Sequence, residues 1–119
     1  MNYNIDAIDQ LDSPALVIYP ELVRHNIALA IRMIGDVQRL RPHVKTHKSA
    51  EATRLMLDAG IRKFKCATIA EAEMLGMCGA ADVLLAYQPV GPKLQRFMAV
   101  MEKYPATRYS CLVDNSAAA

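Results

Sequence analysis

The segment Arg39-Leu40-Arg41-Pro42-His43-Val44-Lys45-Thr46-His47-Lys48 carries most of the information in this 119-residue chain. Read as a β-strand, whose side chains alternate between two faces, it places five basic groups on one face: Arg39, Arg41, His43, Lys45 and His47. Such a row is costly to bury against apolar neighbours, so it should meet water, an anion or a polar ligand. A lysine desolvated beside other cations loses its proton more easily, and Schiff-base chemistry with a carbonyl needs the neutral amine. The segment therefore predicts a reactive lysine at position 45.

Two other interpretations of the basic row stay open at this point, a solvated charged face and a patch that binds phosphate or nucleic acid. The chain has 14 Lys and Arg against 12 Asp and Glu, so its overall charge of +2 does not itself favour a polyanion partner. Aromatic residues, which would support a nucleic-acid surface, make up only 6% of the sequence. We expect no nucleic-acid partner.

The bulk composition is that of one folded domain. Hydrophobic residues account for 53% of the chain and charged residues for 22%, and a length of 119 residues suits one small domain. No apolar run is long enough to span a membrane, and the N-terminus lacks a signal-peptide pattern. We therefore expect a cytoplasmic protein without a membrane segment. The three cysteines, Cys66, Cys78 and Cys111, match no zinc spacing and should be reduced thiols.

The N-terminal third should contain a short apolar strand over 14–19 and then a helix. Pro20 suits the first helical turn, and Gly35 suits the end of the helix. Apolar residues recur at helical spacing between them, so one helix face should be buried: Val23, Ile27, Ile31 and Ile34.

Three further strands are expected at 61–67, 82–86 and 107–113, each after a helix. Ser49 should cap a helix that runs to Gly60, and Thr68-Ile69-Ala70-Glu71 fits the capping box of a helix that ends at Gly79. Pro92 should begin another helix, whose predicted core face is Leu94, Phe97, Met98 and Met101. A last helix should begin after Ser116.

This alternation predicts an α/β protein with a parallel sheet. An open doubly wound sheet and part of a (β/α)₈ barrel both fit the pattern, and both place their chemistry at the carboxyl ends of the strands. The polar residues expected at those ends are Lys45, His47, Thr68, Gln88 and Asp114.

The motif Arg41-Pro42-His43-Val44-Lys45-Thr46-His47-Lys48, followed by Cys66-Ala67-Thr68-Ile69-Ala70-Glu71-Ala72-Glu73, resembles the fold-type III pyridoxal-phosphate enzymes. Within that group it is similar to the D-threonine aldolase and D-serine dehydratase branch. Ala86-Tyr87-Gln88-Pro89-Val90-Gly91 adds weaker agreement in the expected order. The resemblance implies that Lys45 carries pyridoxal 5'-phosphate as a Schiff base and that Lys48 is not the Schiff-base residue.

The other cofactor neighbours are predicted from position. His43 and His47 lie about two residues from Lys45, and Arg41 should contact either the cofactor or an acid in the barrel interior. Thr68 is first a helix cap and second a cofactor neighbour, and Gln88 follows a strand end. His43 and His47 should not share a metal ion, because four residues on a strand separate them by about 13 Å.

The resemblance further implies an alanine-racemase-like (β/α)₈ barrel, of which this chain would be the N-terminal part with about four βα units. Residues 1–19 would join a β-domain and residues 20–119 would form part of the barrel. The implied activity is that of a lyase for D-3-hydroxy amino acids, such as D-threonine-like or D-serine-like substrates. A racemase and a non-catalytic pyridoxal-phosphate protein are the alternatives. A zinc or manganese ion with ligands outside this chain and a homodimer are also implied, and the 119 residues would be inactive by themselves.

Overall fold

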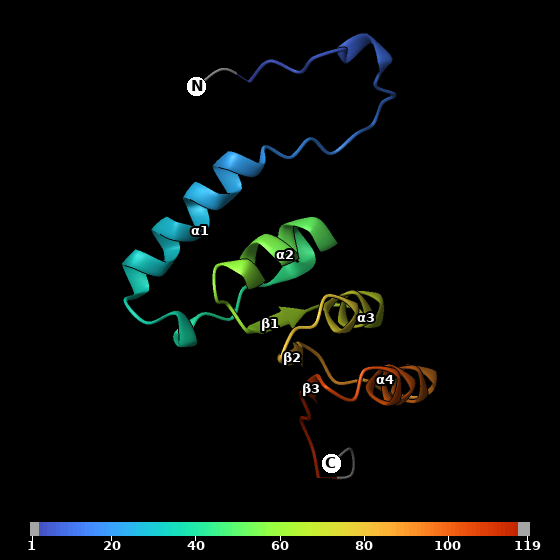
Figure 1. Ribbon diagram of the computed structural model, residues 1–119. Coiled ribbons are helices and arrows are strands. Elements are labelled where there is room, and N and C mark those ends of the chain that lie inside the picture. Colours follow the sequence, from blue (N-terminus) through green and yellow to red (C-terminus); the bar gives the residue numbers. More distant parts are fainter. Residues whose placement is uncertain (1–2, 117–119) are drawn as a thin grey trace.

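The computed structural model describes residues 3–116, which form a parallel sheet covered by helices (Figure 1). The strands are β1 (Lys63–Cys66), β2 (Asp82–Leu85) and β3 (Arg108–Cys111), hydrogen-bonded in the order β1-β2-β3. Lys63 is level with Asp82, and Asp82 is level with Arg108. The α/β prediction is thus confirmed, and each of the three strands lies within the range expected from the sequence.

In the described part of the chain, two α-helices precede β1, one connects β1 to β2 and one connects β2 to β3. They are α1 (Pro20–Ile34), α2 (Ala50–Asp58), α3 (Ile69–Met77) and α4 (Pro92–Lys103). Figure 1 shows α3 and α4 side by side on one side of the sheet, while α1 packs beside α2. None of the helices in the described part of the chain is long and apolar enough to cross a membrane.

The helix starts follow the sequence signals. Ser49 Oγ accepts the Ala52 N–H at 3.1 Å, and Thr68 Oγ1 accepts the Glu71 N–H at the same distance. Each contact satisfies a backbone donor that the first helical turn leaves free. Pro20 and Pro92 occupy the first turns of α1 and α4, where the missing N–H is not needed.

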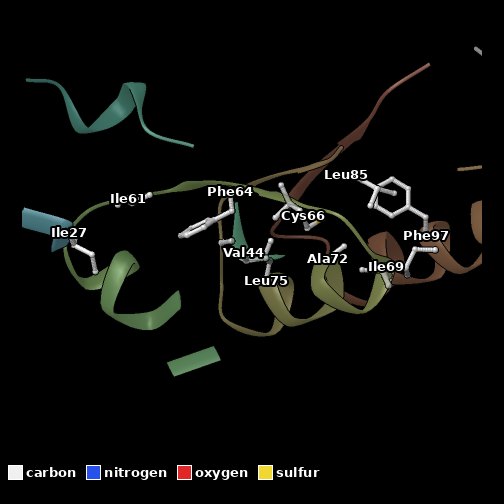
Figure 2. Packing of buried hydrophobic residues seen from close by; sticks show 13 residues of the cluster. Ile27, Val44, Ile61, Phe64, Cys66, Ile69, Ala72, Leu75, Leu85 and Phe97 are labelled. Carbon is white, nitrogen blue, oxygen red and sulfur yellow. The ribbon is translucent and has the colours of Figure 1, made fainter. Parts of the chain in front are cut away.

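The hydrophobic core lies between the sheet and the helices. Alternate residues of β1 and β2 are buried, as expected for a sheet with one face packed against helices, while β3 has none that is fully buried. Side chains from β1, β2, α3 and α4 meet in this layer, and Figure 2 labels Phe64, Cys66, Leu85, Ala72, Leu75 and Phe97 among them. Val83 and Val100 belong to the same cluster. The other face carries the partly exposed Lys63, Lys65, Asp82 and Leu84.

Helix α4 does not bury the face predicted for it. Phe97 is 3% exposed, but Leu94, Met98 and Met101 are 45%, 52% and 41% exposed. The packed face instead consists of Phe97, Val100 and Tyr104, at i, i+3 and i+7. The helix is thus rotated about its axis relative to the prediction, because apolar residues outnumber the positions that contact the sheet.

Two predicted strands are not regular strands. Residues 14–19 have no strand assignment and are mostly exposed, because no neighbouring strand within 3–116 offers a hydrogen-bonding edge. Of the 39–48 segment, a single parallel bridge between His43 and Lys65 remains. Val44–Thr46 forms a short 3-10 helix, another (Val37–Arg39) ends where the segment begins, and residues 40–42 have no regular structure.

Side chains compete with the sheet for the backbone of this segment. His43 Nδ1 accepts the Lys45 N–H at 3.3 Å, and Thr46 Oγ1 donates to the His43 carbonyl at 3.1 Å. Such local contacts favour turns over extended ladders. The prediction of five basic side chains on one strand face is therefore wrong. The first two residues of the lead and the helix predicted after Ser116 lie outside the described residues.

Candidate functional site

Lys45 lies on a tight turn that directly follows the bridge to β1. Val44 is fully buried and anchors the turn, and its carbonyl accepts the N–H groups of His47 at 3.2 Å and Lys48 at 2.8 Å. The Lys45 side chain is exposed and forms no hydrogen bond or ion pair within residues 3–116. The described structure therefore does not show the predicted desolvation of this amine. It shows an accessible amine on a turn whose backbone is held by hydrogen bonds.

His43 lies beside this turn among positive charges. Partial burial lowers the pKa of His43, and the nearby charges of Lys45 and Lys65 lower it further. Its imidazole is thus neutral near pH 7, with Nδ1 occupied by the Lys45 N–H. Neutral imidazole beside an amine can bind or relay a proton.

Glu71 joins the turn to the end of β1. Its side chain is only 5% exposed; one carboxylate oxygen accepts a hydrogen bond from Lys48 Nζ, and the other accepts the Ala67 N–H at 2.7 Å. Burial by itself would raise the pKa of Glu71, but the hydrogen bonds from Lys48 and Ala67 and the positive charge of Lys48 hold it below its ordinary value. Glu71 is therefore an ionised, buried link between α3 and the Lys45 turn.

Arg41 points to the opposite end of β1 from Lys45. Its Nη1 donates to Asp82 Oδ1 at 2.6 Å and to the Phe64 carbonyl at 3.1 Å. The hydrogen bond from Arg41 lowers the pKa of Asp82. Of the two partners considered from the sequence, the structure pairs Arg41 with an acid of the sheet.

His47 lines a cavity of about 360 Å³ between α1 and α2. The cavity walls are mostly apolar and include Ile27, Ala52, Met56 and Ile61. Nδ1 of His47 accepts the Ser49 N–H at 3.0 Å, whereas its buried Nε2 has no hydrogen-bond partner within the described residues. Burial lowers the pKa of His47. The structure does not bring His47 to the Lys45 amine.

Thr68 and Gln88 follow the carboxyl ends of β1 and β2, as predicted. Thr68 caps α3 through its hydroxyl. The Gln88 amide lies against the carboxylate of Asp114, which follows β3, and with its nitrogen turned towards that group it donates to Oδ2 at 3.2 Å. Thr68, Gln88 and Asp114 therefore mark the same edge of the sheet as the Lys45 turn.

Two contributors to this site were not singled out from the sequence. Glu71 was recognised only as a capping residue, although the same N3 position brings its carboxylate to the end of the preceding strand. Lys65 alternates with the buried Phe64 and Cys66, so the period of two in β1 could have indicated that it lies on the opposite face, beside His43.

Comparison with known proteins gives one consistent result. Residues 18–119 match the family described as alanine racemase, N-terminal domain. The chain is 33% identical, over 115 residues and 96% of its length, to a D-threo-3-hydroxyaspartate dehydratase of Delftia sp. (strain HT23). It superposes with a TM-score of 0.74 and 27% identity on the crystal structure of D-threonine aldolase from Filomicrobium marinum, over 90% of this chain.

The chain spans 30% of the length of the dehydratase and 29% of that of the aldolase. The matches confirm the resemblance to fold-type III pyridoxal-phosphate enzymes and the interpretation as a partial barrel rather than an open doubly wound sheet. With 102 of its 119 residues inside the matched region, this chain belongs to the alanine racemase N-terminal domain family.

Proposed function

We propose that the protein containing this chain is a pyridoxal-phosphate-dependent lyase that acts on D-3-hydroxy amino acids, with Lys45 as its Schiff-base lysine. The observation that carries this proposal is the exposed Lys45 amine on a hydrogen-bonded turn that the buried Val44 anchors at the carboxyl side of the sheet. Similarity along nearly the whole chain to a D-threo-3-hydroxyaspartate dehydratase and to a D-threonine aldolase supports the class of substrate.

The residues around Lys45 fit pyridoxal phosphate chemically. An accessible primary amine can condense with the aldehyde, and the neutral His43 and the Lys65 ammonium suit a polar, anionic ligand. When bound, the cofactor supplies an electron sink for the bond that breaks at the substrate Cα. Thr68 and Gln88, at the same edge of the sheet, are proposed to line the cofactor.

Arg41 and His47 enter the proposal as supporting residues. Arg41 fixes the segment before Lys45 against β1 and β2, and the Nδ1 of His47 binds the backbone at the start of α2. His43 is the group proposed to exchange a proton with the Lys45 nitrogen, since its ring already contacts the Lys45 backbone.

Two lyase reactions are candidates within this proposal. Cleavage of the Cα–Cβ bond would release glycine and an aldehyde, as expected of an aldolase. Removal of the Cα proton and loss of the 3-hydroxyl would give a keto acid and ammonia, as expected of a dehydratase. The dehydratase is preferred, because the relative at 33% identity is named as one.

The remaining features of the proposal come from the family resemblance. They are a divalent zinc or manganese ion that assists the reaction, a homodimer and a cytoplasmic location. Within residues 3–116 no group of three or more His, Cys, Asp and Glu side chains is placed to hold a metal ion. We also propose that residues 1–19 belong with a β-domain. The family match that begins at residue 18 and the exposed Leu11, Leu16 and Val17 support this division.

Spectroscopy and product analysis test the proposal. The protein incubated with pyridoxal phosphate should show a visible absorption band that Lys45→Ala abolishes and that Lys63→Ala, on the same sheet, retains. D-threo-3-hydroxyaspartate or D-serine with Mn²⁺ or Zn²⁺ should then yield a keto acid and ammonia, whereas glycine from D-threonine would choose the aldolase. A visible band that persists in a folded Lys45→Ala protein would refute the assignment of Lys45. A band without turnover of any of these substrates would favour a non-catalytic pyridoxal-phosphate protein, and their racemisation would favour a racemase.

A further inference from the structure

Two lysines belong to the turn or follow it closely, and each offers a primary amine. Lys45 lies within the turn, and Lys48 lies three residues later, where the chain enters α2. The side chains of both lysines are exposed, so accessibility does not distinguish their amines. The difference between them lies in what each amine contacts.

Lys48 is held by a buried acid, whereas Lys45 is not. Lys48 Nζ forms an ion pair with Glu71 Oε1, and the carboxylate of Glu71 is 5% exposed. The amine of Lys45 has no such partner within residues 3–116. An ammonium lacks the lone pair that attacks a carbonyl, so an amine held in an ion pair is a poor nucleophile.

Glu71 is fixed from both sides and cannot follow Lys48 if that side chain moves. Oε2 of Glu71 accepts the Ala67 N–H at 2.7 Å, and its own N–H donates to Thr68 Oγ1 at 3.1 Å. Loss of the positive partner would leave a carboxylate charge buried without compensation, which is strongly unfavourable.

The backbone of Lys48 supports the same contact. Its φ is +50°, in the left-handed region that residues with a Cβ rarely adopt. In this conformation its N–H donates to the Val44 carbonyl at 2.8 Å, and the chain turns into α2. The turn therefore carries Lys45 and the ion pair of Lys48 on one rigid backbone.

We propose that Glu71 is a selectivity residue, which binds the Lys48 ammonium and so leaves Lys45 as the amine that condenses with an aldehyde. The condensation forms a bond from a neutral lysine nitrogen to the carbonyl carbon, and the carbonyl oxygen leaves as water with two protons, both supplied from the amine. For Lys48 to react in this way, its nitrogen would first have to leave the ion pair with Glu71. This inference rests on the proposed function, because it takes the aldehyde to be that of pyridoxal phosphate.

Chemical trapping tests this role independently of turnover. The protein is incubated with pyridoxal phosphate and reduced with borohydride, and mass spectrometry of its peptides locates the label. The wild-type protein should carry the label at Lys45. In Glu71→Gln, which keeps an oxygen for the Ala67 N–H, we expect the ratio of label at Lys45 to label at Lys48 to fall by about tenfold, because a charged hydrogen bond to Lys48 is lost. Glu71→Asp, which draws the carboxylate back by one methylene, should give an intermediate ratio.

Glu73→Gln is the matched control. Glu73 lies two residues away on the same helix and pairs with Lys103 at 2.7 Å, far along the chain from the turn. This variant should label as the wild-type protein does. Circular dichroism establishes that each variant is folded before its label is compared.

The outcomes separate the two proposals. Labelling that stays confined to Lys45 in folded Glu71→Gln and Glu71→Asp overturns the selectivity role and leaves the proposed function standing. Predominant labelling of Lys48 in the wild-type protein overturns both the selectivity role and the assignment of Lys45. A wild-type protein that takes up no label at either lysine overturns the proposed function, and the selectivity role with it.

Discussion

Arg41 Nη1 lies 2.6 Å from Asp82 Oδ1 and joins the segment before the Lys45 turn to the first residue of β2. Because the same nitrogen also donates to the Phe64 carbonyl, the guanidinium reaches across β1. The two charged side chains are 31% and 26% exposed, so water screens their attraction only in part. This contact fixes the position of the Lys45 segment against the sheet, where a single backbone bridge would hold it weakly.

Removal of the acid from this pair should destabilise the protein. Asp82→Asn leaves the half-buried guanidinium without a charged partner, and we expect the free energy of unfolding to fall by about 1–2 kcal/mol in urea denaturation. Glu21→Gln is the control, because the Glu21–Arg24 pair is exposed and should contribute nothing measurable. Equal losses in both variants would contradict a structural role for the Arg41–Asp82 pair.

The Arg41–Asp82 pair should also make the free energy of unfolding depend on pH in acidic solution. The pKa of Asp82 and that of Glu71 are both held below their ordinary values, by Arg41 for Asp82 and by Lys48 and Ala67 for the buried Glu71. The unfolded chain therefore binds more protons than the native state in this range. The stabilisation is complete above the ordinary carboxyl values of 3.8 and 4.5 and is lost as the pH falls through the lower native values.

We accordingly expect the urea midpoint to decrease as the pH is lowered from about 5 to about 3. Asp82→Asn should reduce the slope of this decrease, because one of the carboxyl groups with a lowered pKa no longer titrates. An unchanged slope in this variant would show that Asp82 does not contribute to the acid sensitivity.

The rotation of α4 predicts which apolar side chains of this helix matter. Phe97 is 3% exposed and packs edge to face on Tyr109 with ring centroids 5.8 Å apart. Phe97→Ala should therefore cost about 3–5 kcal/mol, whereas Met98→Ala, at a position 52% exposed, should cost less than about 1 kcal/mol. Thermal or chemical denaturation of the two variants measures the difference. Comparable losses of unfolding free energy in the two variants would instead support the helix face predicted from the sequence.

Gly76 is a position where a methyl group does not fit. A Cβ at this residue of α3 would lie 2.7 Å from Tyr104 Cγ and would also clash with the Tyr109 hydroxyl. We expect Gly76→Ala to destabilise the protein by about 1–3 kcal/mol through overpacking, although alanine favours helices. In a Tyr109→Phe background, where one of the clashing atoms is absent, the same substitution should cost less. An equal cost in both backgrounds would place the clash on Tyr104 alone.

Local signals in the sequence predicted the parts of the fold that depend on neighbouring residues. The Ser49 and Thr68 caps and the apolar run of β2 identify their elements, because short-range hydrogen bonds and burial decide them. Residues 14–19 have equally apolar side chains, but a strand exists only where another strand pairs with it. The pattern of one segment cannot supply that partner.

In the candidate site, too, local sequence predicts some features, whereas others depend on contacts between distant residues. The motif around Lys45 predicts a reactive amine there, and that assignment stays a prediction. Period-two alternation misplaced the neighbours of Lys45, because His43 and Thr46 bind the backbone of the turn themselves. The sequence predicted Glu71 only as a capping residue, because its ion pair depends on Lys48, which lies 23 residues earlier in the chain. Contacts across such a separation follow from the docking of α3 on β1 and not from local sequence.

The order of strands in the sheet, β1-β2-β3, is also their order in the chain. Each strand therefore finds its pairing edge on the strand synthesised just before it, and each connecting helix folds back over a surface that already exists. Both strand pairs of this sheet thus join neighbours in the chain, and contacts that are local in sequence favour fast folding. The backbone bond between the Pro42 carbonyl and the Lys65 N–H, which holds the segment before the Lys45 turn on β1, does not involve β3.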